Sequence, residues 1–326
     1  MTRRFGIAAG VLVAAVTVYL VVTWPGEPRY QGRSLSAWLA MLDDREGGNY
    51  IYMRLDTQPP AAPTKEQLEA AEAVRQMGSK AVPELLRMLQ TEEPAWRRVF
   101  RGLRVWLLRS QTPRPSTQAD WSTAEATTRH RAALGLIALN PTDKPAVAQL
   151  LPLFKKPPLS QGAALVLASM GTQGLEPLRS EITNNRPTVP WGGGFAIWAL
   201  AQFPTNGHAI APYLVRDLTN ARPRFPMVSA WALTRIQTDP EAAVQALTNH
   251  IEEPGMRDLC LKALANYGPR AKSAVPFLID MVRRSQKGAR PQDVIETLKA
   301  IDLEASVKAW GYVWDVPNAE EMHANR

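Results

Sequence analysis

A five-residue phrase with apolar residues at its second and fifth places recurs along this chain and constrains its fold more than any other feature. The apolar pairs are Val74/Met77, Leu136/Leu139, Leu167/Met170, Leu200/Phe203, Leu233/Ile236, Leu264/Tyr267 and Leu298/Ile301. The first members of successive pairs are 62, 31, 33, 33, 31 and 34 residues apart, and 62 is twice 31. A period of this length is typical of stacked helical repeats.

A second apolar helix is expected after each phrase, beyond a short polar break. Its apolar positions follow the spacing i, i+3, i+4 and i+7, which forms one helical stripe, as in Val82, Leu85, Leu86 and Leu89. The same spacing returns over 211–218 and 275–282. Each of these three helices begins with a proline, because the first turn does not use the missing N–H, at Pro83, Pro212 and Pro276.

Each unit is therefore predicted to be a helical hairpin. One hairpin buries too few apolar side chains to offset the conformational entropy of ordering its residues, so neighbouring hairpins must supply the remaining burial. The predicted fold is all-α: a right-handed α-solenoid of stacked hairpins over residues 65–314, with a long exposed face that is available for binding.

Two of the repeated segments resemble HEAT repeats, especially the short HEAT-like variety. They are Ala73-Val74-Arg75-Gln76-Met77-Gly78-Ser79-Lys80-Ala81-Val82-Pro83 and Ala263-Leu264-Ala265-Asn266-Tyr267-Gly268-Pro269-Arg270-Ala271-Lys272-Ser273-Ala274-Val275-Pro276. Both run from an Ala/Leu helix through a glycine turn to an Ala-Val-Pro helix start. The period is shorter than the usual HEAT length, and other α-solenoids are the alternative, although the ankyrin and tetratricopeptide signature phrases do not recur.

An uncharged, mostly apolar run of 20 residues lies near the start of the sequence, from Phe5 to Trp24. As a helix it reaches about 30 Å, which is enough to cross the hydrocarbon core of a bilayer. Arg3 and Arg4 precede the run, and no small-residue cleavage phrase of a secretory signal ends it. Residues 1–24 are therefore predicted to form one uncleaved transmembrane signal anchor.

The charges around this anchor predict its orientation. The positive-inside tendency places the N-terminus in the cytoplasm and the solenoid outside it, in an extracytoplasmic or periplasmic location. Within the anchor, Gly6, Gly10 and Ala14 recur every four residues, and such a stripe lets two membrane helices approach closely. A homodimer through this stripe is a further expectation, and simple lipid-facing packing is the alternative.

Two less regular segments flank the predicted array. Residues 25–64 are expected to form a juxtamembrane linker in which Ser34 caps a short helix, with one apolar side that carries Leu35, Trp38, Leu39 and Leu42. This helix is expected to cover the first repeat, and docking of a partner is the alternative. Residues 315–326 lose the periodic pattern and are expected to form a polar C-terminal tail.

An irregular helix and loop at 94–120 interrupt the array, within the double step of 62 residues. The helix at 95–109 carries arginines opposite its apolar side, and the candidate partner-binding residues on it are Arg97, Arg101 and Arg104. A second basic cluster consists of Arg283, Arg284 and Arg290. With a net charge of +8 and a pI near 9.7, these clusters suit an anionic partner, and plain solvation of a helix surface is the alternative.

Signatures of catalysis and of metal binding are not found in the sequence. The four histidines are scattered and none belongs to a His-Glu-x-x-His phrase, nor is there a Gly-x-Ser-x-Gly elbow or a phosphate-binding loop. No catalytic, cofactor-binding or metal-binding residue is predicted, and no cofactor is expected. Cys260 is the single cysteine and lies between Leu259 and Leu261, so we expect a buried thiol without a disulfide.

The expected function is that of a membrane-tethered scaffold for protein–protein interaction at the cell envelope, without chemistry of its own. One alternative is a binder of an anionic ligand, such as a lipid headgroup, an acidic polymer or nucleic acid, through the basic residues. Nucleic acid is disfavoured because the predicted compartment does not suit it. The other alternative is a HEAT-like enzyme, because the resemblance extends to the repeats of bilin lyases.

Overall fold

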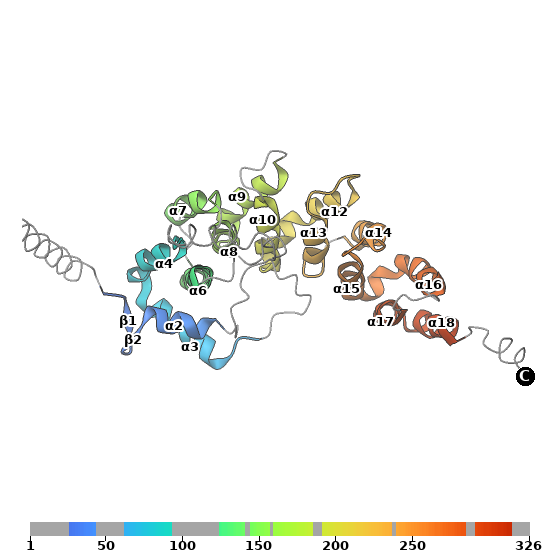
Figure 1. The fold of residues 1–326 in the computed structure, drawn as a ribbon, viewed down its shortest axis with the longest axis horizontal. Coiled ribbons are helices and arrows are strands. Elements are labelled where there is room, and N and C mark those ends of the chain that lie inside the picture. Colours follow the sequence, from blue (N-terminus) through green and yellow to red (C-terminus); the bar gives the residue numbers. More distant parts are fainter. Residues whose placement is uncertain are drawn as a thin grey trace, which may run out of the picture.

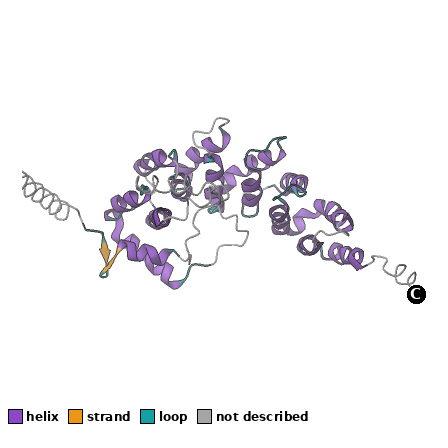
Figure 2. Cartoon of the chain, in the orientation of Figure 1, coloured by secondary structure: helices purple, strands orange, loops and turns teal. Residues whose placement is uncertain are grey.

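The computed structural model describes residues 26–43, 62–92, 124–140, 144–156, 159–184, 191–236, 239–284 and 291–314. Over these residues the protein is helical, apart from one small antiparallel ribbon that joins β1 (Arg29–Tyr30) to β2 (Arg33–Ser34) (Figure 1, Figure 2). The described part of the chain is thus all-α in class and is compatible with a helical repeat.

The helices form successive hairpins. These are α3 (Lys65–Met77) with α4 (Val82–Leu89), α6 (Ala124–Leu139) with α7 (Lys144–Phe154), α8 (Ser160–Ser169) with α9 (Thr172–Thr183), α10 (Gly192–Ala201) with α12 (Ala211–Thr219), α13 (Pro226–Leu233) with α14 (Pro240–His250), α15 (Arg257–Tyr267) with α16 (Val275–Arg284), and α17 (Pro291–Ile301) with α18 (Leu303–Trp314). Short helical turns lie inside three of them: η1 (Gly78–Lys80), α11 (Pro204–Gly207), η3 (His208–Ile210) and η4 (Gly268–Ala274). Every recurring apolar phrase lies at the C-terminal end of the first helix of a hairpin.

The hairpins stack in chain order. First helices pack on first helices, from α3 to α6, α8, α10, α13, α15 and α17, and second helices pack in the pairs α7 with α9, α12 with α14, and α16 with α18. Figure 1 shows the resulting elongated row, with α3 and α18 at opposite ends. The buried apolar side chains form one continuous cluster from Leu35 to Ala309, so no hairpin has a core of its own.

Glycine makes the turn inside three of the hairpins. Gly78, Gly171 and Gly268 follow the recurring phrase at the same place and have φ angles of +57°, +62° and +55°. A side chain at such an angle is strained, whereas glycine adopts it freely, so the first helix can end sharply and the second can fold back.

The short helix α2 (Leu35–Leu42) covers the first hairpin. Its Ser34 cap accepts a hydrogen bond from the Ala37 N–H at 3.4 Å, and it packs on α3 and α6. Leu35 and Leu39 are fully buried in this contact. α2 therefore shields an end of the row that would otherwise expose apolar surface.

The prediction of a transmembrane helix over residues 1–24 requires a correction. Within the described ranges, no helix is both long enough and apolar enough to cross a membrane. The longest is α6 with 16 residues, which gives about 24 Å against the roughly 30 Å of hydrocarbon in a bilayer. The run Phe5–Trp24, with the stripe of Gly6, Gly10 and Ala14, lies outside the described residues. The fold class is corrected to all-α alone, and the membrane-anchored, extracytoplasmic location predicted from that helix is withdrawn.

A candidate binding groove between α9 and α12

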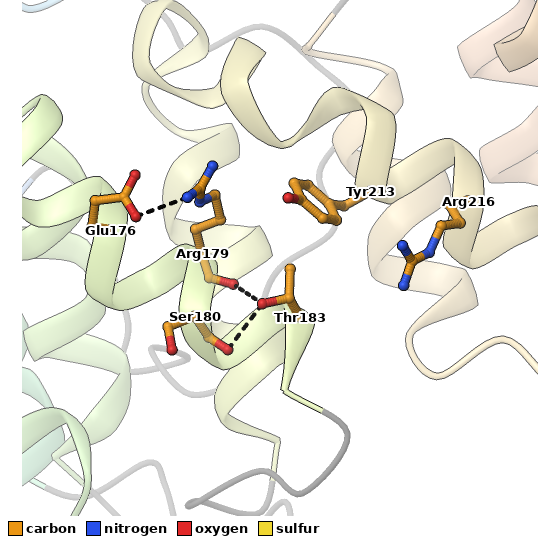
Figure 3. Close-up of a pocket in the computed structure, with 6 residues that line it drawn as sticks. All are labelled: Glu176, Arg179, Ser180, Thr183, Tyr213 and Arg216. Atoms are coloured by element: carbon orange, nitrogen blue, oxygen red, sulfur yellow. Dashed lines mark hydrogen bonds and ion pairs between the residues drawn. The ribbon is translucent and has the colours of Figure 1, made fainter.

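An open polar groove with a volume of about 480 Å³ lies between the second helices of two neighbouring hairpins. Its lining comes from α9 and α12: Glu176, Arg179, Ser180, Thr183, Tyr213 and Arg216 (Figure 3). Figure 3 shows the Tyr213 ring on the side of α12 that faces Arg179. The groove thus combines two guanidinium groups, one aromatic ring and three hydroxyl groups.

Hydrogen-bond donors dominate this groove. Arg179 pairs with Glu176 at 3.0 Å, but both side chains are about half exposed, so water weakens their attraction. Arg216 is exposed and has no ion-pair partner in the described part of the chain. The Thr183 hydroxyl is already used, since it donates to the backbone carbonyl oxygens of Arg179 at 3.0 Å and Ser180 at 3.3 Å. The groove therefore offers positive charge to a ligand that carries acceptors.

A set of hydrogen bonds beside the groove holds α9 and α12 in place. The Asp217 carboxylate, next to Arg216, accepts from the backbone N–H groups of Arg224 at 2.8 Å and Phe225 at 3.1 Å. It also accepts from the hydroxyl of Ser229 at 2.9 Å. The Arg224 guanidinium donates in turn to the Asn184 carbonyl at 2.7 Å, just past the end of α9. A cation suits this position because a helix C-terminus carries partial negative charge.

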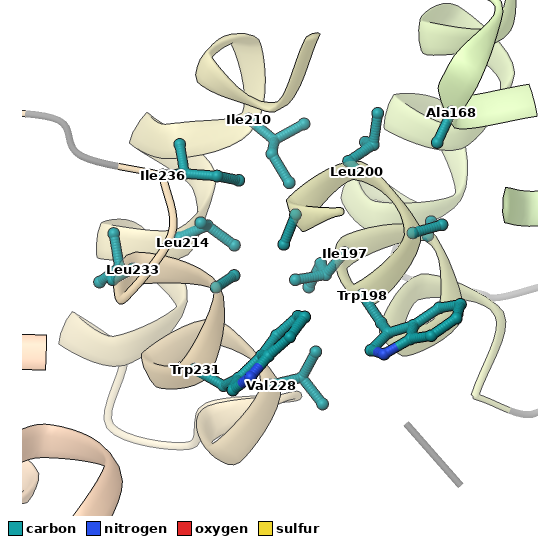
Figure 4. Close-up of a cluster of buried hydrophobic side chains, with 14 of the residues drawn as sticks. Ala168, Ile197, Trp198, Leu200, Ile210, Leu214, Val228, Trp231, Leu233 and Ile236 are labelled. Carbon is teal, nitrogen blue, oxygen red and sulfur yellow. The ribbon is translucent and has the colours of Figure 1, made fainter. Parts of the chain in front are cut away.

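The apolar core beneath the groove fixes the distance between the hairpins. Figure 4 shows Leu214 of α12, Ile197 of α10 and Trp231 of α13 in one buried cluster. Gly193 at the start of α10 lies so close to Phe225 that an added Cβ would approach the ring to 2.7 Å. With one side of α12 committed to this cluster, Arg216 is exposed on the outer surface and Tyr213 is partly buried at the edge of the core.

Of the partner contacts proposed from the sequence, Arg283 and Arg284 lie outside the groove. Arg97, Arg101, Arg104 and Arg290 are outside the described residues. Arg283 donates to the Tyr312 hydroxyl and stacks on that ring at 4.2 Å from its centroid. Arg284 forms ion pairs with Glu252 at 3.0 Å and Asp280 at 2.8 Å. The charge of Arg284 is thus balanced within the chain, and the two arginines are not part of the groove.

Metal ligands, thiols and imidazoles are the other groups that could support chemistry. In the described ranges, no group of three or more histidine, cysteine, aspartate or glutamate residues is placed to hold a metal ion. Cys260 is buried as expected, and burial raises the pKa of its thiol to about 12. His250 is also buried, and its two ring nitrogens contact the Leu218 carbonyl and the Glu253 carboxylate, the latter at 2.8 Å. Both side chains therefore serve packing between hairpins.

Sequence reasoning missed the groove residues. Each is an ordinary polar residue on the surface of a helix, so no local pattern marks it. One signal was present: Arg179 and Tyr213 are 34 residues apart, which is one repeat period, so both are on second helices of adjacent units.

A scan of the chain against protein-family models gives no match, and a search of curated proteins gives none either. The geometry of the groove is therefore the basis for any functional proposal.

Proposed function

We propose that this protein is a HEAT-like, non-catalytic scaffold that binds a partner protein along the outer surface of its second helices. The single observation that carries the proposal is the groove between α9 and α12, where two neighbouring hairpins present polar and aromatic side chains over a fixed core. A rigid row of helices fits this role because its surface is extended and needs little ordering on binding. The HEAT-like phrases of the sequence support the same assignment.

The groove has the composition of a protein contact. Tyrosine and arginine are enriched in interfaces, since each combines a large contact area with directional hydrogen bonds. Tyr213 and Arg216 sit one helical turn apart on α12, so they face the same side, opposite Arg179. An acidic segment of a partner would match these donors.

Photo-cross-linking in cells tests this proposal. A photoreactive residue in place of the exposed Ser180 is expected to capture one defined protein, identified by mass spectrometry. The matched control places the same residue at Lys262, which is exposed on the first helix α15, away from the groove. Equal capture from both positions, or no capture from Ser180, would refute binding through the groove.

The second candidate function is binding of an anionic ligand that is not a protein. It is favoured by one observation, the pair of arginines in the groove, of which Arg216 has no ion-pair partner among the described residues. The assay is a salt titration of binding to inorganic polyphosphate, with the variant Arg179→Glu/Arg216→Glu compared against Arg97→Glu/Arg101→Glu/Arg104→Glu. Binding that falls steeply with salt and is lost only in the first variant supports this candidate, because exposed charges are screened within about 10 Å at 0.1 M salt.

A further inference from the structure

Two large apolar side chains are exposed where the first helices α10 and α13 begin. Trp191, the residue before α10, is 67% exposed, and Met227, in the first turn of α13, is 46% exposed. α10 packs on α13, and Figure 1 shows the two helices side by side. Single exposed apolar residues are common on protein surfaces, but here two of them belong to the same ends of neighbouring helices. We call Trp191 and Met227 the edge pair.

The two helix ends touch each other at a glycine. Gly193 follows Trp191 by two residues, and a Cβ added to it would approach the ring of Phe225 to 2.7 Å. Phe225 in turn precedes Met227 by two residues. Two residues of chain span at most about 7 Å, so both members of the edge pair lie close to this contact.

The backbone at Trp191 is unusual for a residue with a large side chain. Its φ of +66° and ψ of 3° place it in the left-handed region, which glycine and asparagine adopt more readily. Its carbonyl accepts the Phe195 N–H at 2.9 Å, so the chain turns sharply into α10 at this residue. A tryptophan in an unfavourable conformation that does not bury its ring points to a role in contact with another molecule.

Positive charge surrounds the edge pair. Arg222 and Arg224 are exposed in the segment that leads into α13. The Arg224 guanidinium stacks on the Phe225 ring, 5.0 Å from its centroid. Asp217, the carboxylate nearest to these arginines in sequence, is occupied by the backbone N–H groups of Arg224 and Phe225. An occupant of this surface is therefore expected to carry negative charge beside an apolar group.

The groove between α9 and α12 leads to the edge pair. The same Cβ added to Gly193 would lie 3.3 Å from the carbonyl oxygen of Glu181. Glu181 lies between Ser180 and Thr183, which line the groove, and α9 ends at Thr183 (Figure 3). From Glu176 to Thr183 the helix covers about 10 Å. An extended segment of about six residues, at about 3.3 Å each, is long enough to follow the groove and reach the edge pair.

We infer that the edge pair is the apolar end of the partner-binding surface, which takes an extended acidic segment with one apolar side chain at its end. The acidic side chains face Arg179 and Arg216, and the apolar side chain packs on Trp191 and Met227. Tryptophan offers a large contact area and methionine adapts its shape, so both suit this role. The inference rests on the proposed function and adds to it the chemistry of the bound segment. A protein segment fits better than a phospholipid surface, because a flat bilayer would not enter the groove.

Fluorescence anisotropy with two labelled peptides tests the inference on the full chain. One peptide has about six aspartate and glutamate residues, and the other adds leucine at both ends, so that either chain direction places a leucine on the edge pair. The wild-type protein is expected to bind the leucine peptide at least about tenfold more tightly, because an apolar side chain is buried. Equal affinity for the two peptides would overturn the inference.

Substitutions in the edge pair assign this preference to its residues. Trp191→Asn is expected to abolish the preference and to leave binding of the acidic peptide unchanged, since asparagine tolerates the left-handed backbone. Met227→Gln is expected to reduce the preference about threefold. The matched control is Leu68→Gln, because Leu68 is 55% exposed on α3 in another hairpin, and it is expected to have no effect. Equal effects of Trp191→Asn and Leu68→Gln would overturn the inference. Circular dichroism of each variant checks that the helices remain folded.

Two further measurements separate this inference from its alternatives. Arg216→Glu is expected to weaken binding of both peptides at least about tenfold. If neither peptide binds the wild type, or if Arg216→Glu retains both, the proposed function fails and the inference fails with it. Vesicles of phosphatidylserine and phosphatidylcholine are expected to leave the protein in the supernatant on centrifugation. Sedimentation with the vesicles that is lost in Trp191→Asn would assign the edge pair to lipid and overturn the inference.

Discussion

Removal of the Asp217 carboxylate is expected to destabilise the centre of the row. This carboxylate accepts three hydrogen bonds, from the N–H groups of Arg224 and Phe225 and from the hydroxyl of Ser229. Ser229 is fully buried in the folded protein, and its hydroxyl loses its acceptor when Asp217 becomes alanine. The first two bonds hold the chain where it enters α13, in the manner of a helix cap.

The magnitude follows from these contacts. Leaving the buried Ser229 hydroxyl without its acceptor costs about 1–3 kcal/mol. Loss of the contacts at the entry to α13 costs about 1–2 kcal/mol, as for other helix caps. We therefore expect Asp217→Ala to lower the free energy of unfolding by about 2–5 kcal/mol. Asp258→Ala serves as the control, because Asp258 is exposed in the first turn of α15 and its loss is expected to cost under about 1 kcal/mol.

A double-mutant cycle with Ser229 isolates the buried pair. Urea unfolding followed by far-UV circular dichroism measures the free energy of unfolding of Asp217→Ala, Ser229→Ala and the double variant. The double variant lacks the stranded hydroxyl, so its loss is expected to be smaller than the sum of the single losses by about 1–2 kcal/mol. A strictly additive cycle, or an Asp217→Ala variant as stable as the wild type, would refute the reasoning.

Further predictions concern three other sites of the row. Gly174→Ala is expected to lower the free energy of unfolding by about 1–3 kcal/mol, because its Cβ would lie 1.8 Å from the Leu167 carbonyl oxygen. Thermal unfolding measures this loss, and a variant with the wild-type melting temperature would contradict the prediction. The Cys260 thiol, with its pKa raised by burial from 9.0 to about 12, is expected to resist iodoacetamide at pH 8 until urea is added. Its contribution to stability is complete below pH 9 and declines as the pH rises from about 9 to 12, because the folded state holds the proton more tightly; urea titrations at several pH values measure this decline. Asn206→Ala removes a bond of 2.9 Å to the Ala168 carbonyl of the preceding hairpin and is expected to lower the free energy of unfolding by about 1 kcal/mol in the same titration.

The all-α class could be predicted from the sequence, because the apolar residues that become buried recur with the period of the helical array. Leu200, Leu233 and Leu264 are all fully buried at the ends of first helices, as the recurring phrase predicts. The Ser34 cap and the buried Cys260 were also predicted, since each depends on neighbours within a few residues.

The expectations about the basic cluster and the membrane helix depended on contacts and helix lengths that a short stretch of sequence does not reveal. The basic cluster with Arg284 stays a prediction of an anionic partner, and the structure adds that Arg284 pairs with Asp280 one turn away on α16 and with Glu252 in the turn after α14. The predicted membrane helix was wrong as a statement of the fold, because the described helices are too short to span a bilayer.

The sequence by itself determined that paired helices stack side by side, because apolar residues at a constant period must be buried against their neighbours. Only the tertiary structure decided where a ligand could bind. The groove exists because Arg224 ties the end of α9 to the segment anchored by Asp217, and because Gly193 admits the ring of Phe225. These residues come from different hairpins, so their contacts follow from packing across the row and leave no pattern within any one repeat.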